Sequence, residues 1–296
     1  MHRTFNFQIE TACHASTIYN YLRSKSFSRQ SIIALKKIPE SILLNGKWCY
    51  VNEKLSAGDC LTIHLIEKES SENIVPCEIP LDIVYEDEDI LILNKPANMP
   101  VHPSLNHYEG TLANGVVYYY EKQGIPYVFR CTNRLDKDTS GLILLSKHMV
   151  AAGILSTMIA AGHIKREYLA LVSQGKEPLP KEGTVNAPIA RMSDSLITRC
   201  VDFQKGERAV THYRKLQEKN GYDLISLHLE TGRTHQIRVH MSYLGHPLLG
   251  DSLYYGNMEL IKRQALHSYR LSFPHPITKE PMTFTAPVPP DMEKLI

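Results

Sequence analysis

Apolar positions follow two different spacings near the start of the chain. Residues 16–38 carry them at helical spacing, and Ser28 is a suitable N-cap for the second of two short helices. Residues 42–44 lead into Asn45-Gly46, which is a strong turn signal, and residues 61–65 then alternate apolar and polar side chains as a strand does. Two helices followed by short strands predict a small unit in this part of the chain.

The remainder of the chain mixes the two spacings. Residues 90–93 and 142–145 are uninterrupted apolar runs that predict buried strands, and residues 148–161 predict a helix. Residues 225–229 alternate apolar and polar side chains, which predicts a strand with one buried face. We expect Thr234 to cap the helix that follows this strand. Strands and helices without a strict βαβ rhythm favour an α+β fold class.

We divide the chain into a small α+β unit (residues 1–68), a polar linker (residues 69–79) and a larger α+β domain (residues 80–296). The first 68 residues hold nine basic and five acidic side chains, whereas residues 71–90 hold seven acidic and no basic ones. The whole chain has 33 Lys and Arg against 31 Asp and Glu, so a basic surface for nucleic acid must be local. Residues 188–208 are polar and contain several Arg, which fits either a mobile arm over a polyanion or a solvated loop.

Composition argues against several other classes of protein. The six cysteines are scattered, with neither a C-x-x-C pair nor metal-ligand spacing to histidine, so we expect reduced thiols and no metal. None of the apolar stretches approaches the ~20 residues of a membrane span. We expect a cytoplasmic protein without a membrane partner. We also expect a monomer, because the chain shows no long amphipathic heptad run.

Candidate chemistry lies in Asn133-Arg134-Leu135-Asp136, directly ahead of the buried run at residues 142–145. Charges at the edge of a core are costly unless they are paired or functional, which favours a site. Taken alone, the segment also fits a solvated loop with a surface ion pair. A second candidate is Arg233, which lies at the predicted strand-to-helix junction, where a side chain is exposed at the edge of a sheet.

Three separate segments resemble the RluA family of RNA pseudouridine synthases. They are Asn133-Arg134-Leu135-Asp136 with Thr139-Ser140-Gly141, Lys165-Arg166-Glu167-Tyr168, and Gly232-Arg233-Thr234-His235-Gln236-Ile237-Arg238. Asn94-Lys95-Pro96 resembles the first conserved segment of the family, and residues 1–68 resemble the S4-like RNA-binding domain in Ser28-Arg29-Gln30. The resemblance implies a catalytic domain with a mixed, mainly antiparallel sheet flanked by helices and loops.

The resemblance also implies a reaction and the residues that carry it. Such a synthase flips a uridine out of its stack and isomerises it without a cofactor. Three catalytic residues are implied: Asp136 as nucleophile or base, Tyr168 stacking on the flipped base, and Arg233 pairing with Asp136. Six residues are implied to bind RNA: Arg134 in the vacated stack, and Lys165, Arg166, Arg238, Arg29 and Lys95 elsewhere. We expect the partner to be ribosomal RNA, with transfer RNA as the alternative.

Two positions depart from the family pattern, and two other functions remain open. Asn133 stands where the family most often has His, and an amide cannot act as an acid or base. Asn98 stands where Gly is usual, and Asn tolerates left-handed backbone angles. An RNA-binding or ribosome-assembly protein on an inactive scaffold is one alternative. A metal-dependent nucleotidase or phosphodiesterase is the other, for which Asp136 and Asp138 offer only a thin set of ligands.

Overall fold

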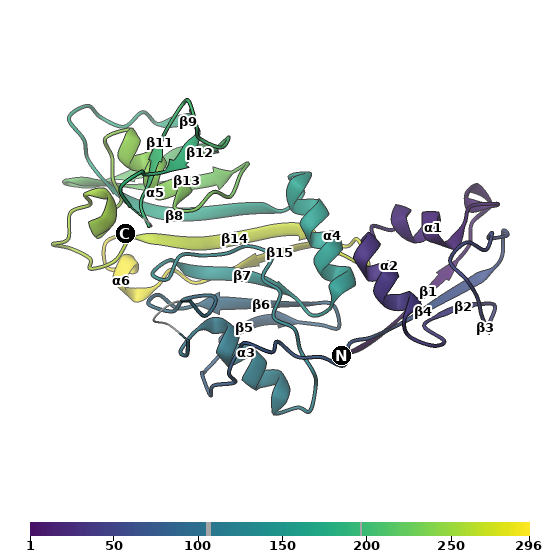
Figure 1. Cartoon of the computed structure of the whole chain (residues 1–296). Coiled ribbons are helices and arrows are strands. Elements are labelled where there is room, and N and C mark those ends of the chain that lie inside the picture. The colour runs from purple at the N-terminus through teal and green to yellow at the C-terminus, as the bar shows by residue number, and fades with distance from the viewer. Residues whose placement is uncertain (105–107, 196) are drawn as a thin grey trace.

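A computed structural model describes residues 1–104, 108–195 and 197–296 and shows two sheets of different size with a short hairpin. The smaller sheet, close to the N-terminus, lies at one end of the larger one, next to helix α4 (Met149–Ala160) (Figure 1). Among the described residues, we find no helix that is both long and apolar enough to cross a membrane.

The N-terminal unit is a four-stranded sheet with two short helices. Its elements are β1 (His2–Gln8), the 3-10 turn η1 (Thr11–Cys13), α1 (Ile18–Ser24), α2 (Arg29–Lys36), β2 (Ile42–Leu44), β3 (Lys47–Trp48) and β4 (Cys60–Ile66), with strand order β1-β4-β2-β3. The two predicted helices are confirmed, and Ser28 caps α2 by accepting the backbone N–H of Ser31 at 2.9 Å. Asn45 and Gly46 have φ of 50° and 76°, as a two-residue hairpin turn of this type requires. The sequence pattern misses β1, because Phe5 is the one fully buried residue in it.

The larger sheet has nine strands and carries the rest of the chain. Its strands are β5 (Ile83–Glu86), β6 (Ile90–Lys95), β7 (Ser140–Ser146), β8 (Lys165–Ser173), β9 (Glu182–Asn186), β12 (Val210–Glu218), β13 (Tyr222–Leu229), β14 (Leu266–Pro274) and β15 (Pro281–Thr285). The order is β5-β6-β7-β14-β8-β13-β12-β9, with β15 on β14. Among these pairings only β7 with β14 is parallel in the described part of the chain. The expected mixed, mainly antiparallel α+β fold is confirmed.

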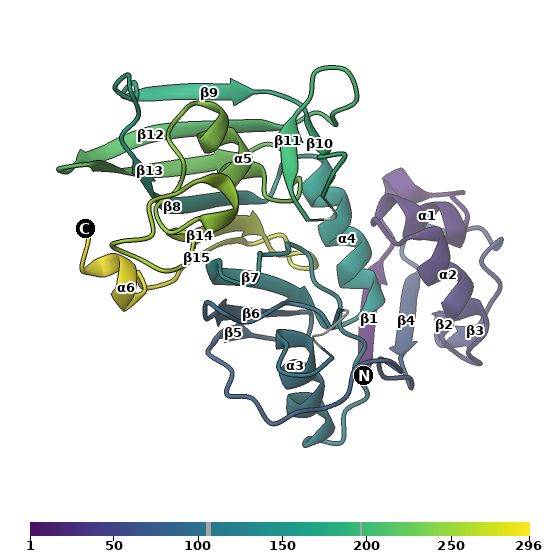
Figure 2. The same cartoon turned by 60° about the vertical axis from the view of Figure 1, so that its left-hand side comes forward.

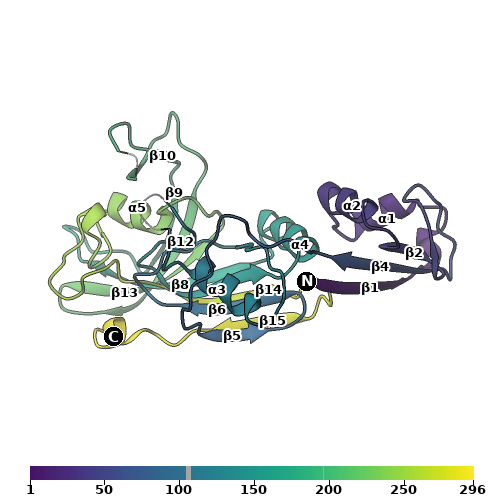
Figure 3. The same ribbon diagram turned by 60° about the horizontal axis from the view of Figure 1, so that its bottom comes forward.

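Helices and a hairpin flank this sheet. Besides α4 they are α3 (Leu112–Glu121), the hairpin strands β10 (Ile189–Arg191) and β11 (Arg199–Val201), α5 (Gln236–Tyr243), the 3-10 turn η2 (Ser252–Tyr254) and α6 (Pro290–Glu293). The β10–β11 hairpin lies beside α5 (Figure 2) and projects from the same side of the sheet as α4 and α5 (Figure 3). A paired hairpin therefore replaces the arm or loop expected in residues 188–208, of which residue 196 lies outside the described residues.

Strand β7 is central, and the segment that precedes it carries the candidate site. All seven of its residues are buried, as the apolar run predicts. At its second position Gly141 has a φ of 106°, and a Cβ there would overlap the carbonyl oxygen of Ser268 on β14. Only glycine fits this close parallel pairing. The loop ending at residue 139 is thereby fixed against the centre of the sheet.

Two predicted details of the last strand–helix pair are wrong. Helix α5 begins at Gln236, and its N-cap is His235 in the left-handed conformation (φ 58°, ψ 20°), so Thr234 does not cap it. Strand β13 is buried on both faces over most of its length, and Ser226 is only 2% exposed. The hydroxyl of Ser226 is satisfied there, since its Oγ donates to Glu167 Oε1 on β8 at 3.1 Å.

The N-terminal unit and the large sheet share one apolar core and several ion pairs. Phe5 packs edge-on against His148 at the N-cap of α4, with ring centroids 5.7 Å apart. Arg3 donates from Nε to Asp89 at 2.9 Å, and Arg130 donates to Glu67 at 2.9 Å. The segment between β4 and β5 contains neither helix nor strand. These contacts hold the smaller unit beside α4.

Candidate active site

A cleft of about 900 Å³ opens where the loop before β7, strand β8 and the start of α5 meet. Six of the nine residues expected in the site line it: Arg134, Asp136, Arg166, Tyr168, Arg233 and Arg238. These residues come from three segments that are distant in the sequence. The sheet order brings them together, because β14 places the loop before β7 next to β8.

Asp136 is paired with Arg238 in this cleft. Arg238 Nη1 donates to Asp136 Oδ2 at 3.0 Å, while its Nε and Nη2 donate to both oxygens of the buried Asp251 at 2.7 and 2.8 Å. The ring of Tyr254 lies 5.0 Å from the guanidinium carbon. Although burial opposes the charge, the hydrogen bonds and the two carboxylates raise the pKa of Arg238 above its ordinary value. A cation fixed in this way holds the Asp136 carboxylate in one place in the cleft.

The pairing expected between Arg233 and Asp136 is wrong. Arg233 is 41% exposed and pairs with Glu207, and its Nε donates to the carbonyl oxygen of Arg208 at 3.2 Å. Arg238 holds Asp136 instead, although the resemblance assigned it to RNA. Helical side chains lean toward the N-terminus of their helix, so an Arg in the first turn of α5 reaches the cleft at that end. The position of Arg238 in the first turn of the predicted helix was thus the sequence signal that could have indicated its pairing with Asp136.

Tyr168 lies on β8 with its ring in the same cleft. It is 4% exposed, and its strand neighbours are Leu227 on β13 and Ser268 on β14. Burial raises the pKa of the Tyr168 hydroxyl, with the Asp136 charge acting in the same direction. The phenol therefore stays protonated at neutral pH and presents an aromatic face beside the carboxylate.

Comparison with known proteins decides the family. A family model described as RNA pseudouridylate synthase matches residues 89–243. A protein of Bacillus subtilis (strain 168), named Uncharacterized RNA pseudouridine synthase YjbO, is 44% identical over 280 residues, covering 95% of this chain and 98% of that protein. The chain belongs to the RluA family of RNA pseudouridine synthases.

Other relatives of this pseudouridine synthase agree. Ribosomal large subunit pseudouridine synthase D of Escherichia coli (strain K12) is 39% identical over 274 residues, covering 88% of this chain and 82% of that protein. The solved structure of Human RNA Pseudouridylate Synthase Domain Containing 1 is 27% identical with a TM-score of 0.57, over 70% of this chain and 83% of that one. The enzyme is accordingly an isomerase that acts on RNA.

Asn133 has a structural task in the synthase. It is 4% exposed, its Oδ1 accepts the backbone N–H of Leu144 at 2.8 Å, and its Nδ2 donates to the carbonyl oxygen of Leu142 at 3.3 Å. Both ends of the amide thus fasten the catalytic loop to β7. Asn98 has a φ of 59°, so the left-handed turn expected for Gly is kept there.

Lys95 of the synthase does not reach RNA, which corrects the expectation. Its side chain is fully buried, and Nζ donates to the carbonyl oxygens of Pro96, Met99 and Lys137 at 2.8 to 2.9 Å. Burial lowers the pKa of this ammonium to about 7, against the charges of Asp138 and Asp136. Lys95 therefore ties the segment at residues 95–99 to the loop of Asp136.

Arg29 and Lys165 of the synthase lie outside the cleft. Both are exposed, Arg29 at the start of α2 in the N-terminal unit and Lys165 at the start of β8. Neither lines the cavity. Their assignment to RNA binding stays a prediction.

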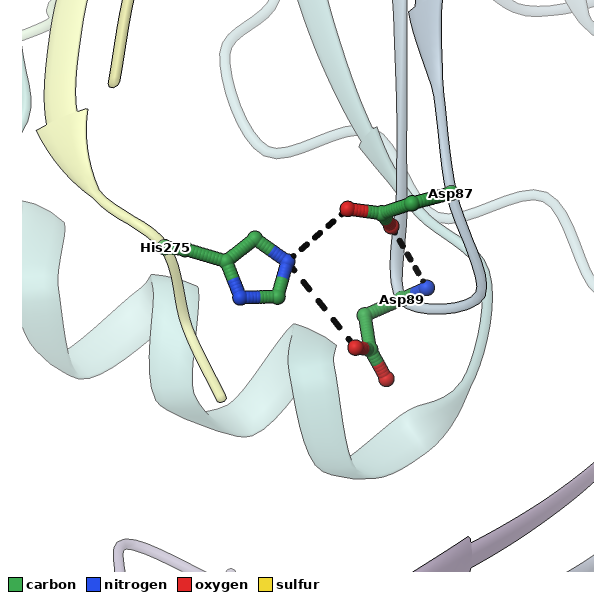
Figure 4. A group of neighbouring side chains, drawn as sticks. All are labelled: Asp87, Asp89 and His275. Atoms are coloured by element: carbon green, nitrogen blue, oxygen red, sulfur yellow. Dashed lines mark hydrogen bonds and ion pairs between the residues drawn. The ribbon is translucent and has the colours of Figure 1, made fainter. Parts of the chain in front are cut away.

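Among the described residues, the group of three potential metal ligands that lie close together is outside the cleft. Asp87, Asp89 and His275 form a compact group elsewhere, with His275 Nε2 at 3.0 Å from Asp87 and 3.8 Å from Asp89 (Figure 4). The backbone N–H groups of Ile277 and Thr278 donate to Nδ1 of this histidine, so its Nε2 carries the proton. A protonated nitrogen cannot ligate a metal. The group therefore does not fit a metal ion.

Proposed function

We propose that this synthase converts uridine in ribosomal RNA to pseudouridine, with Asp136 as the reacting carboxylate. The observation that carries the proposal is the Arg238–Asp136 ion pair at 3.0 Å in a cleft of about 900 Å³. A cleft of this size accommodates a flipped nucleotide. Relatives from Escherichia coli and Zymomonas mobilis are named as ribosomal large subunit pseudouridine synthases, which supports ribosomal RNA over transfer RNA.

The reaction makes three demands on this cleft. The N1–C1′ bond must break, the base must turn, and C5 must bond to C1′; C5 loses a proton and N1 gains one, so no cofactor is consumed. Asp136, held by Arg238, acts as nucleophile or base. Tyr168 stacks on the flipped base and restricts how it turns.

Contacts to the RNA are proposed for the basic residues around the cleft. Arg134 is exposed at the mouth, where its planar guanidinium suits the gap left by the flipped base. Arg166 also lines the cleft, where a guanidinium suits a phosphate of the bound RNA. Lys165 lies nearby on the same strand.

We further propose that residues 1–68 are an S4-like RNA-binding domain, with Arg29 on its exposed face, joined by residues 69–79 to the catalytic domain at residues 80–296. The basic excess in this unit supports the assignment, because phosphate contacts supply most of the affinity for RNA. We propose that the enzyme acts as a monomer in the cytoplasm.

The test uses the purified protein without added metal, its Asp136→Asn variant, and total RNA from a bacterial strain that lacks its own enzymes of this family. Pseudouridines are mapped by carbodiimide labelling. We expect new sites in ribosomal RNA with the unaltered protein and none with Asp136→Asn. Asp138→Asn is the matched control, since Asp138 lies two residues away and does not line the cleft.

The outcomes separate the alternatives. New sites confined to transfer RNA would move the substrate to that class while keeping the chemistry. Equal activity of Asp136→Asn and the unaltered protein would remove Asp136 from the reaction. Binding of RNA by both proteins without any new site would favour the inactive-scaffold alternative.

A further inference from the structure

His235 is the N-cap residue of α5, and its backbone conformation is uncommon for residues other than glycine. It is left-handed (φ 58°, ψ 20°), and its side chain makes no capping hydrogen bond to the helix. Such a conformation costs about 1–3 kcal/mol and is frequent at active sites. The imidazole is instead turned into the cleft, where it is 11% exposed.

The tautomer of His235 follows from its hydrogen bonds. The backbone N–H of Arg199 on β11 donates to Tyr254 Oη at 2.9 Å, so this hydroxyl is already an acceptor. Among the described residues, the acceptor within reach of its own proton is His235 Nδ1, at 2.9 Å, and we assign that proton to this hydrogen bond. The remaining ring nitrogen, Nε2, therefore carries a proton. Burial lowers the pKa of His235. The charges of Asp136 and Asp251 oppose this shift, and those of Arg238 and Arg199 add to it. The ring is therefore neutral at neutral pH.

This Nε2–H faces the reacting carboxylate. Its nitrogen is 3.9 Å from Asp136 Oδ2, the same oxygen that accepts from Arg238 at 3.0 Å. The other oxygen, Oδ1, makes no hydrogen bond within the described part of the chain. A separation of 3.9 Å is about 1 Å too long for a hydrogen bond, and contacts of this kind often tighten when the substrate closes a site.

We propose that His235 is a positioning residue which, held by Tyr254, donates its Nε2–H to Oδ2 of Asp136 when RNA fills the cleft. Arg238 and His235 then both donate hydrogen bonds to Oδ2 of Asp136. Oδ1 is left as the oxygen that reacts. The inference rests on the proposed role of Asp136 and extends it to a choice between its two oxygens.

Both the ring and the hydroxyl of Tyr254 make contacts in this site. Its ring stacks against Arg238 and its hydroxyl orients His235, so one side chain supports both donors to Asp136. A phenylalanine at this position keeps the ring and loses the hydroxyl. Tyr254→Phe therefore tests the orientation of His235 without removing the support of Arg238.

The experiment measures single-turnover rates at saturating RNA and the dissociation constant for RNA, on substrate identified with the unaltered protein. His235→Asn tolerates the left-handed backbone but is too short to reach Asp136, whereas His235→Gln places an amide N–H near the position of Nε2. We expect His235→Asn to lower the rate about tenfold, the size of one hydrogen bond to a charged group, with the dissociation constant within about twofold. His235→Gln should recover part of that loss. The exposed His163 supplies the matched control, His163→Gln, with an unchanged rate.

A double-mutant cycle provides the second readout. Tyr254→Phe should lower the rate alone and add nothing in the His235→Asn background, because the hydroxyl acts through the imidazole. Fully additive losses, or an unchanged rate in folded His235→Asn, would overturn the inference. If His235→Asn is unfolded by circular dichroism, the comparison of His235→Gln with Tyr254→Phe decides alone. An inactive unaltered protein would instead mean failure of the proposed function.

Discussion

Replacing Arg238 by Met separates the catalytic and structural consequences of its position between two carboxylates. Asp251 is 1% exposed at its side chain and accepts two hydrogen bonds from Arg238, while Asp136 is 26% exposed and accepts one. Methionine has similar length without charge. The substitution leaves Asp251 as an uncompensated buried charge, which costs about 3–5 kcal/mol of unfolding free energy in comparable buried pairs.

The double variant Arg238→Met/Asp251→Asn removes that buried charge. We expect it to recover most of the lost stability, because a neutral amide no longer needs a cation beside it. We expect no recovery of activity, since Asp136 still lacks the hydrogen bond and ion pair that Arg238 supplies. The double variant should therefore be more stable than Arg238→Met and equally inactive.

Urea unfolding followed by circular dichroism gives the free energies, and release of tritium from RNA labelled at C5 of uridine gives the activity. Asp251→Asn alone serves as a further comparison, with Arg238 still able to pair with Asp136. A double variant no more stable than Arg238→Met would refute the assignment of the loss to buried charge. A double variant with restored activity would refute the role given to Arg238.

Three further predictions concern the RNA, the backbone and pH. Arg134→Ala should weaken RNA binding and reduce the slope of log K against log salt by roughly one unit if its guanidinium meets a phosphate, and should leave the slope unchanged if it only fills the stack; filter binding at several salt concentrations distinguishes these. Gly141→Ala should lower the unfolding free energy by about 3 kcal/mol or more, because its Cβ overlaps the backbone of Ser268 and its φ is 106°; a melting temperature within a degree of the unaltered protein would contradict this. Burial lowers the pKa of His267 to about 4, so the unfolded chain binds more protons between pH 6.5 and pH 4 and stability falls by about 3 kcal/mol as the pH drops through that window. His267→Gln should show a correspondingly smaller loss in urea titrations at the two pH values.

Local signals in the sequence predicted the elements whose formation depends on near neighbours. The cap at Ser28, the turn at Asn45-Gly46 and the buried run of β7 all appear in the structure where they were expected. The motif residues also proved informative, since Asp136 and Tyr168 line one cleft. In each case the decisive interactions lie within a few residues, or the residue type limits the choices.

Long-range packing decided what the sequence could not. Two arginines five residues apart, Arg233 and Arg238, were equally suited to pair with Asp136, and only the orientation of α5 selects the second. Lys95 has the charge of an RNA contact, yet the loops around it supply three carbonyl oxygens and bury it. Arg238 pairs with a residue 102 positions away, and one of the three acceptors of Lys95, Lys137, is 42 positions away.

The position of β14 has a consequence for the order in which the enzyme is made. The strand is inserted between β7 and β8, although it is synthesised more than 90 residues after both of them. Until residues 266–274 emerge, Asp136 and Tyr168 belong to two separate half-sheets with unpaired edges. The catalytic centre is thus assembled only after β14 has been made, and a nascent chain arrested before β14 has no means of modifying the RNA around it.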